Sequence, residues 1–249
     1  MHSHNSIYAV ETLDFVERCW FFNETDSTNT QAATLCPSSP TGLHVFWALR
    51  QTKGRGRHGR DFFSDVDGGL WASIAVPMND VGKHFIINRA LCLALCRAIR
   101  SVAPNAPVAI KWPNDIYWGH GKICGILLEN PGRTPPILIV GFGLNVNIRR
   151  TQFPEELQTI ATSLTTETGS TYDLLSLLVH ILTEYHGIHT MDQDNAHAEY
   201  LDLLYGVGRL AATDRIGGIV ETVEPDGRLV LRNGNKRRYV FSGTLRFVD

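Results

Sequence analysis

The apolar residues of the chain follow two spacings, which together predict a mixed structure of strands and helices. Apolar runs within 20–22, 44–49, 70–76, 108–110 and 137–140 are typical of buried strands. In 84–102, Phe85, Ile86, Leu91, Leu95 and Ile99 recur at helical spacing, so we predict a core helix there. Further helices are predicted over 30–35, 171–189 and 196–204, and a hairpin is predicted over 116–129.

The pattern changes at residue 207, where short strands begin to alternate with tight turns. Gly-Gly at 217–218, Pro-Asp-Gly at 225–227 and Asn-Gly at 233–234 are turn sequences of the kind that join antiparallel strands. This alternation of short strands and tight turns predicts a small β-barrel attached to a larger domain. We therefore expect two domains, one at 1–206 and one at 207–249.

The composition is that of an ordinary globular protein. Of the 249 residues, 43% are hydrophobic and 19% are charged. No apolar run reaches the ~18 residues that a membrane span needs. The five cysteines form no Cys-x-x-Cys pair, which favours a reduced, cytoplasmic setting, and the ten histidines show no zinc-binding spacing.

A segment rich in glycine and arginine, RQTKGRGRHGRDFFS at 50–64, links two of the predicted strands and is called the basic loop below. Its five lysines and arginines set against Asp61 give 5 − 1 = +4 in a chain whose formal net charge is −2. Glycine allows close backbone approach, and arginine presents a fixed set of donors to carboxylate or phosphate oxygens. The loop is therefore predicted to cover a ligand that carries phosphate.

The residues of the basic loop alone do not decide between several functions. Gly54, Gly56 and Gly59 match the dinucleotide-binding spacing, but no helical pattern follows Gly59 as that motif requires. A nucleic-acid surface usually accompanies a pI above about 9, whereas the pI of this chain is about 6.5. A mobile loop that closes on a nucleotide or an acyl phosphate fits best, and a solvated basic turn is the alternative without function.

Polar residues also follow other predicted strands. The sequence Lys-Trp-Pro-Asn-Asp at 111–115 comes directly after 108–110, at a strand end where sheets often bind ligands, although Pro-Asn-Asp would also make a good turn. Lys122 opens the second strand of the hairpin, and Gly125 lies inside it, which weakens a strand unless another group approaches its backbone closely. Asn145 ends the strand that begins at 137, where an amide could read a nucleobase edge.

Taken together, four ordered motifs resemble the biotin protein ligase family: DSTN at 26–29, GRGRHGR at 54–60, KWPND at 111–115 and KICGIL at 122–127. Their separations are similar, and the likeness covers nearly the whole chain. The resemblance implies an α+β fold, in which helices flank a central mixed β-sheet related to that of class II aminoacyl-tRNA synthetases, followed by a small SH3-like β-barrel. It also implies the reaction: ATP and biotin give biotinyl-5′-AMP and pyrophosphate, and biotin then passes to a lysine of a biotin carboxyl carrier domain.

The resemblance further implies site roles. Arg57 and Lys122 are expected to neutralise the carboxylate and the α-phosphate, and Asp115 to orient the acceptor amine. Asn114 is expected to face either the phosphates or the Mg²⁺ ion that they hold, and no residue is firmly assigned to the metal. The expected biotin-binding residues are Ser27, Thr28, Asn29, Gln51, Arg55, Gly56, Arg57, Lys122 and Gly125. The expected ATP-binding residues are Arg57, Arg60, Trp112, Asn114, Lys122 and Asn145.

The chain departs from the family pattern in two respects. Phe62 stands where the motif usually has tryptophan, and no winged helix precedes the catalytic domain, which resembles the monofunctional class without DNA binding. The expected partner is the carrier domain of a biotin-dependent carboxylase, with no DNA and no membrane, and exposed strand edges could permit a homodimer. A lipoate or octanoate ligase and an RNA-binding module are the alternatives to a biotin ligase.

Overall fold

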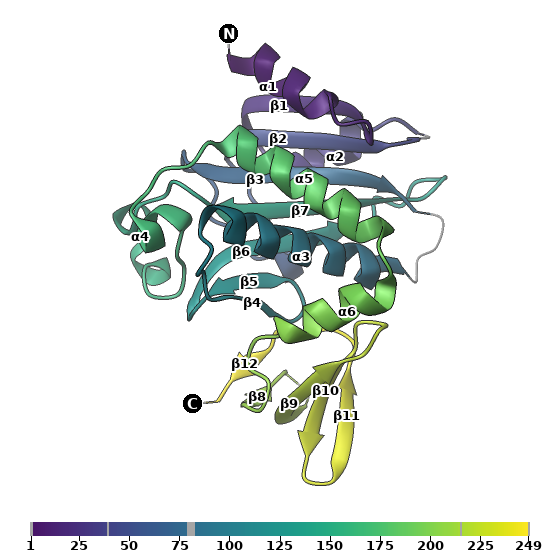
Figure 1. Ribbon diagram of the computed structural model, residues 1–249, viewed down its shortest axis with the longest axis vertical. Helices are drawn as coiled ribbons and strands as arrows, with labels where there is room; N and C mark the ends of the chain where they lie inside the picture. The colour runs from purple at the N-terminus through teal and green to yellow at the C-terminus, as the bar shows by residue number, and fades with distance from the viewer. Residues whose placement is uncertain (1, 39, 79–82, 215, 249) are drawn as a thin grey trace.

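The computed structural model describes residues 2–38, 40–78, 83–214 and 216–248, with the side chains of 2–6 excepted. Its main body is a seven-stranded mixed sheet of order β1-β2-β3-β7-β6-β5-β4 (Figure 1). β1 and β2 are parallel, and the other neighbours are antiparallel. The strands are β1 (Val16–Thr25), β2 (Leu43–Gln51), β3 (Gly69–Pro77), β4 (Val108–Lys111), β5 (Asp115–Trp118), β6 (Gly121–Glu129) and β7 (Ile137–Asn145).

Helices cover both faces of this sheet. α3 (His84–Val102), α5 (Leu174–Thr190) and α6 (Gln193–Asp202) lie over one face, and α2 (Thr28–Leu35) lies over the other (Figure 1). Leu138 and Val140 of β7 pack in the same cluster as α3, while Ile137 and Ile139 pack with α2. Successive side chains of a strand point to opposite faces of the sheet, so β7 contributes to both layers. The remaining helices are α1 (His2–Glu11), α4 (Leu164–Thr168) and the 3₁₀ turns Arg57–Gly59, Arg150–Gln152 and Glu155–Leu157.

The predicted core helix and the predicted strands are confirmed. α3 is apolar on most of its circumference because the sheet packs on one side of it and α5 and α6 pack on the other. α1 was not predicted, since 2–11 has no helical apolar spacing. α5 begins at Leu174 and α6 at Gln193, each three residues from its predicted start, and each starts on an aspartate that caps the first turn.

We expect the variant Leu95→Ala to lower the free energy of unfolding by ~2–5 kcal/mol, because it leaves a cavity in a close-packed core. Leu95 is fully buried on α3. Val102 ends the same helix and is 38% exposed, so Val102→Ala should cost less than ~1 kcal/mol. Urea denaturation measures both; equal losses would contradict the assignment of the α3 core.

The C-terminal segment folds into a second, five-stranded antiparallel sheet of order β11-β10-β9-β8-β12, consistent with an SH3-like domain. Its strands are β8 (Leu210–Ala212), β9 (Gly217–Val223), β10 (Leu229–Asn233), β11 (Lys236–Val240) and β12 (Arg246–Phe247). The link between α6 and β8 runs along the edge of the main sheet at Ile110, whose N–H donates to the Leu203 carbonyl at 2.7 Å and whose carbonyl accepts from Tyr205 N–H at 2.9 Å. Across the described part of the chain, no helix has both the length and the apolar character to cross a membrane.

Candidate active site

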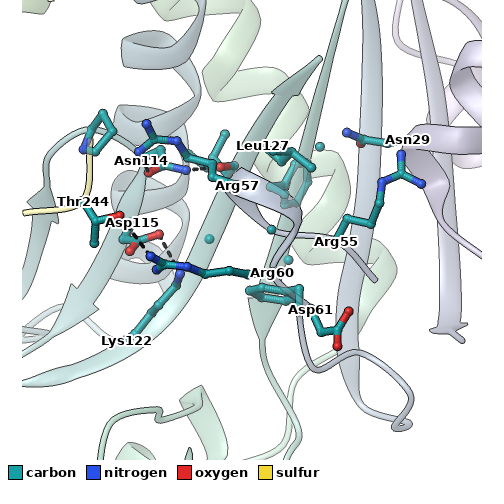
Figure 2. A pocket seen from close by; sticks show the side chains of 18 of the residues that line it. Asn29, Arg55, Arg57, Arg60, Asp61, Asn114, Asp115, Lys122, Leu127 and Thr244 are labelled. Atoms are coloured by element: carbon teal, nitrogen blue, oxygen red, sulfur yellow. Dashed lines mark hydrogen bonds and ion pairs between the residues drawn. The ribbon is translucent and has the colours of Figure 1, made fainter. Parts of the chain in front are cut away.

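A cavity opens on the α2 side of the sheet because two neighbouring positions of β7 carry no side chain there. Ile137 and Ile139 fill the space beneath α2, whereas the next residues on that face are Gly141 and Gly143. Gly125 of β6 pairs with Gly143 and widens the gap. The cavity has a volume of about 160 Å³, and the basic loop lies across it (Figure 2).

Thirteen of the fourteen predicted site residues line this cavity, although they come from segments far apart in the sequence. The N-terminus of α2, the basic loop, the β4–β5 turn and β6 all contribute, and so does the loop between β11 and β12. The thirteen residues are Ser27, Thr28, Asn29, Gln51, Arg55, Gly56, Arg57, Arg60, Trp112, Asn114, Asp115, Lys122 and Gly125.

Asn145, the fourteenth, does not line the cavity. It is buried, and its side-chain Nδ2 donates to the Thr162 carbonyl at 2.9 Å. Trp112 lines the cavity but points its indole N–H elsewhere, toward the Gly227 carbonyl of the C-terminal sheet at 2.9 Å. In this structure Trp112 therefore joins the two sheets to each other.

One end of the cavity is a buried hydrogen-bond network. The backbone N–H and the hydroxyl of Thr28 donate to Gln51 Oε1 at 2.8 and 3.1 Å. Ser73 Oγ lies 2.7 Å from Thr28 Oγ1 and 2.6 Å from Asn29 Oδ1, and Asn29 Nδ2 donates to Glu129 Oε2 at 2.7 Å. Such a network holds its donors and acceptors in fixed positions, as recognition of a neutral polar group requires.

Arg55 connects this network to the basic loop. Its guanidinium donates to Glu129 Oε2 at 3.1 Å and to Thr30 Oγ1 at 2.7 Å. The loop itself is a small hairpin in which Gly56 N–H donates to the Arg60 carbonyl at 2.7 Å and Phe62 N–H donates to the Gly54 carbonyl at 3.0 Å. A β-carbon on Gly54 would lie 2.0 Å from Ser64 Oγ, so only glycine fits there.

At the other end of the cavity, cationic groups gather around Asp115. Lys122 Nζ lies 2.7 Å from Asp115 Oδ1. Arg57 donates to Asn114 Oδ1 at 3.3 Å and to the Gly243 carbonyl at 3.1 Å (Figure 2). Burial lowers the pKa of Arg57, an effect that Asp115 partly offsets.

Lys111 is a further cation of the cavity. It belongs to the motif at 111–115, but it was not predicted as a site residue. It lines the cavity, and its Nζ donates to the Tyr117 hydroxyl at 3.2 Å. Burial lowers the pKa of Lys111, and Asp115 opposes that shift. Glu129 and Ser73 were missed as well, since neither lies in a recognisable motif and only the folded sheet brings them to Asn29.

The charge balance of the cavity favours an anionic ligand. Arg57, Arg60, Lys111 and Lys122 line it, against the carboxylates of Asp61 and Asp115, and the fifth cation, Arg55, is already paired with Glu129. Lysine and arginine attract phosphate and carboxylate most strongly where water is partly excluded. The cavity is therefore suited to a ligand with a neutral polar group at one end and negative charge at the other.

Phe62 covers the bare glycine backbones on the cavity floor. A β-carbon on Gly143 would lie 2.5 Å from the Phe62 ring, and one on Gly125 would lie 3.0 Å from it. Lys122 Nζ is 5.7 Å from the ring centroid, and Trp71 meets the same ring edge-on at 6.0 Å. The phenylalanine thus supplies an apolar face at the position where the family motif usually has tryptophan.

We expect the variant Gly141→Ala to lower the free energy of unfolding by ~1–3 kcal/mol, because overpacking forces buried groups apart. The new β-carbon would lie 2.0 Å from Asn29 Oδ1, which the network holds in place. A β-carbon added to Gly187 of α5 would meet no atom of the described residues within 4 Å beyond its chain neighbours and the backbone of its own helix, so Gly187→Ala should stabilise by ~0.5–1 kcal/mol. Urea denaturation distinguishes the two, and a neutral Gly141→Ala would show that Asn29 is free to move.

Comparison with known proteins adds a family assignment to this geometry. Residues 21–145 match the model of the biotin/lipoate A/B protein ligase family. The chain is 30% identical to the biotin--[acetyl-CoA-carboxylase] ligase of Mycobacterium tuberculosis, over 88% of the chain and 85% of that protein. It is 35% identical to the bifunctional ligase/repressor BirA of Bacillus spizizenii over 58% of the chain, but spans only 45% of that relative's length.

A solved structure shares the fold over nearly the whole chain. The biotin protein ligase from Aquifex aeolicus in complex with biotin and ATP superimposes with a TM-score of 0.81 at 25% sequence identity. The alignment covers 93% of this chain and all of that one. The predicted α+β fold, a mixed sheet with flanking helices followed by a small β-domain, is thus confirmed.

Proposed function

Because the chain belongs to the biotin/lipoate A/B protein ligase family, we propose that it is an ATP-dependent biotin protein ligase. In the first step a biotin carboxylate oxygen attacks the α-phosphorus of ATP, and the bond to the β-phosphate breaks to release pyrophosphate. In the second step the amine of an acceptor lysine attacks the acyl carbon of biotinyl-5′-AMP, releasing AMP and a proton. The single observation that carries the proposal is that residues from all four motifs line one cavity.

The first step brings two anions into contact, and the cavity supplies the charge that this needs. Like unit charges 4 Å apart repel by about 4 kcal/mol at an effective dielectric of about 20. Arg57 lines the cavity from the basic loop and Lys122 lines it from β6, and Asp115 forms an ion pair with Lys122 and interacts electrostatically with Arg57. We assign them to the carboxylate and the α-phosphate, with Arg60 and Lys111 as further cations beside the phosphates.

The neutral ureido ring of biotin fits the network end of the cavity. Ser27, Thr28, Asn29 and Gln51 would pair with its donors and acceptors, and Gly56 and Gly125 would border it. Arg55 would act here through its bonds to Glu129 and Thr30 rather than as a free cation.

The remaining nucleotide contacts stay predictions. Trp112 would face adenine with its ring while its N–H keeps the hydrogen bond to the Gly227 carbonyl. Asn145 could contact adenine only after its hydrogen bond to the Thr162 carbonyl breaks. Asn114 has both polar ends engaged, with Arg57 and with the Ile126 carbonyl. Among the described residues no group of three or more His, Cys, Asp or Glu side chains could hold a metal ion by itself. Mg²⁺ would therefore enter with the ATP phosphates, and Asn114 would contact the metal through Oδ1 only after Arg57 releases that atom.

For the second step we assign Asp115 to orienting the acceptor amine. Its carboxylate is held by Lys122 at 2.7 Å, and it lines the cavity beside Arg60 and Thr244 (Figure 2). The acceptor would be the carrier domain of a biotin-dependent carboxylase. Loop closure over the adenylate would protect the mixed anhydride from water.

Two further assignments have support in the structure, and two more rest on the sequence alone. A catalytic domain at 1–206 and a C-terminal domain at 207–249 are supported by the end of α6 at Asp202 and the start of the second sheet at Leu210. A cytoplasmic location is supported by five cysteines that are all free and buried. The absence of DNA binding and the formation of a homodimer stay predictions from the sequence.

The proposed activity is tested by incubating the protein with ATP labelled at the α-phosphate, Mg²⁺ and biotin. We expect a labelled biotinyl adenylate and stoichiometric pyrophosphate, and no acyl adenylate when lipoate or octanoate replaces biotin. An adenylate formed with lipoate alone would favour the lipoate ligase instead. Salt-dependent binding of RNA without pyrophosphate release would favour the RNA-binding module.

A further inference from the structure

Glu129 contacts two residues of the cavity from a position beyond its wall. It is the last residue of β6 and follows Leu127, which lines the cavity, by two positions. Its Oε2 accepts from Asn29 Nδ2 at 2.7 Å and from the Arg55 guanidinium at 3.1 Å. Asn29 belongs to α2 and Arg55 to the basic loop, and both lie at one end of the cavity (Figure 2). One carboxylate therefore connects the sheet, the helix and the loop.

The Asn29 amide lies against the bare backbone of β7, with a polar contact on each side. A β-carbon on Gly141 would lie 2.0 Å from Asn29 Oδ1, and Ser73 of β3 is the cross-strand partner of Gly141. Ser73 Oγ lies 2.6 Å from Oδ1, while Glu129 accepts from Nδ2. Asn29 is 4% exposed, so its amide has little contact with water and depends on these two neighbours.

Glu129 determines which end of the Asn29 amide faces Ser73. An ionised carboxylate only accepts hydrogen bonds, whereas a serine hydroxyl can either donate or accept. Ser73 alone would therefore permit both orientations of the amide, but Glu129 permits only the one that directs Nδ2 toward itself. Oδ1 then faces Ser73, and because an amide oxygen cannot donate, it takes the hydroxyl proton of Ser73.

This orientation also determines the hydrogen bonds of Thr28. Because the Ser73 proton goes to Asn29, the contact of 2.7 Å between Ser73 Oγ and Thr28 Oγ1 must use the Thr28 proton, which Ser73 shares with Gln51 Oε1 at 3.1 Å. The backbone N–H of Thr28, which can only donate, also holds Gln51 Oε1 at 2.8 Å. The network is therefore fixed from both ends, by a carboxylate at one and by a backbone N–H at the other.

Glu129 also neutralises the positive charge of Arg55. The Arg55 guanidinium forms an ion pair with Glu129 and donates to Thr30 Oγ1 at 2.7 Å, so it holds the basic loop against α2. Without the carboxylate, this guanidinium would place an unpaired charge and additional donors beside a neutral ligand group. The ion pair keeps this end of the cavity close to neutral, and the excess positive charge stays at the other end, around Asp115.

We propose that Glu129 is a positioning residue for biotin, which fixes the pattern of donors and acceptors that the network presents to the ureido ring. This inference rests on the proposed function, because it takes the ureido ring as the neutral group of the ligand. A ureido group carries two N–H donors and one carbonyl acceptor in a rigid arrangement. A site whose amide and hydroxyl groups already have one orientation binds such a group more tightly than a site that must first order them.

The variant Glu129→Gln tests this role, because glutamine has nearly the same shape but is neutral and can donate as well as accept. Both orientations of the Asn29 amide then become possible, and Arg55 loses its ion pair. We expect the Kd for biotin, measured by calorimetry without ATP, to rise about tenfold. The kcat for adenylate formation at saturating biotin should stay within about twofold of the wild type, because the variant weakens binding in the ground state and the transition state equally.

A background that lacks both partners separates positioning from a general structural role. In the double variant Asn29→Ala, Arg55→Met, neither contact of Glu129 with the cavity residues remains. Adding Glu129→Gln to this background should change the Kd for biotin by less than about twofold, because residues that act through one another are not additive. A tenfold rise there as well would show that Glu129 does not act through Asn29 and Arg55.

Glu221 provides the matched control. It is also a strand glutamate in an ion pair with an arginine, Arg237, but it lies on β9 of the second sheet. Glu221→Gln removes the same charge by the same substitution, and it should leave both the Kd for biotin and the kcat within about twofold of the wild type. Equal rises of the Kd in Glu129→Gln and Glu221→Gln would contradict the proposal.

The results that overturn this inference differ from those that overturn the proposed function. An unchanged Kd in Glu129→Gln, or a kcat that falls as much as the affinity, would remove the positioning role while the wild-type protein still binds biotin. If the wild-type protein itself bound no biotin in the calorimeter and formed no adenylate, the ligase assignment would fail instead.

Discussion

Replacing Arg57 with alanine will lower the rate of adenylate formation at least ~100-fold, which is the usual effect of removing one positioned group that stabilises charge in a transition state. Arg57 is held in place by Asn114 and by the Gly243 carbonyl, so its guanidinium is directed before any ligand arrives. Arg57 is half-buried, and this burial lowers its pKa. Water therefore screens its charge less than it screens that of an exposed arginine. Pyrophosphate release in the presence of saturating biotin measures the effect.

Arg50 provides the matched control for this prediction. It stands at the start of the same basic loop, but its guanidinium lies 3.3 Å from Asp67 and 3.7 Å from Asp65 on the surface, and it does not line the cavity. Exposed pairs of this kind contribute ~1 kcal/mol or less, so Arg50→Ala should change the rate of adenylate formation by less than about fivefold. Equal rates for the two variants would remove Arg57 from its proposed role.

The second large effect is expected from Lys122→Ala, which should also depress adenylate formation at least ~100-fold. Lys122 contributes its own positive charge and holds Asp115 at 2.7 Å. Without the ammonium group, the Asp115 carboxylate would be left beside the phosphates and would repel them. The loss should therefore exceed that of the attraction alone, and single-turnover rates with labelled ATP will measure it.

The double variant Lys122→Ala, Asp115→Asn tests this explanation. Removing the carboxylate should restore part of the rate of adenylate formation that Lys122→Ala loses, while transfer to the carrier domain stays slow because Asp115 is missing. Lys53, an exposed lysine of the same basic loop, is the control, and Lys53→Ala should behave as the wild type. A double variant no faster than Lys122→Ala would show that Asp115 does not oppose the phosphates.

The layered body of the fold could be predicted because local pattern and global packing agree. Apolar runs such as 70–76 became strands buried on both faces, and the helical spacing of 84–102 became α3 between the sheet and the outer helices. α1 escaped prediction because its sequence has no such spacing. Residues of all four motifs line one cavity. Each motif lies at a strand end, in a turn or at a glycine of the sheet, where side chains or ligands have space.

The partners of the site residues could not be predicted in the same way. Glu129 reaches Arg55 and Asn29 across 74 and 100 residues of sequence, and no motif marks it. Trp112 and Arg57 donate to carbonyl groups of the C-terminal segment, and a carbonyl group carries no sequence signal at all. Asn145 was predicted to bind the nucleotide, and in this structure its Nδ2 donates to the Thr162 carbonyl, a partner that no sequence motif marks.

These contacts give the C-terminal sheet a part in the site that its sequence alone does not reveal. Gly227 and Gly243 accept hydrogen bonds from Trp112 and Arg57, and Thr244 contacts Arg60. Because Thr244 and Leu245 of the loop between β11 and β12 line the cavity, we expect the first step to depend on this loop.

The most direct test of the account is a crystal structure of the protein with biotin and α,β-methylene-ATP, which cannot release pyrophosphate. We predict that the guanidinium of Arg57 and the ammonium of Lys122 will each lie within ~2.7–3.2 Å of a carboxylate or α-phosphate oxygen, with the ureido ring of biotin at Thr28 and Gln51. Ligands bound in the cavity with both cations directed away from them would contradict it.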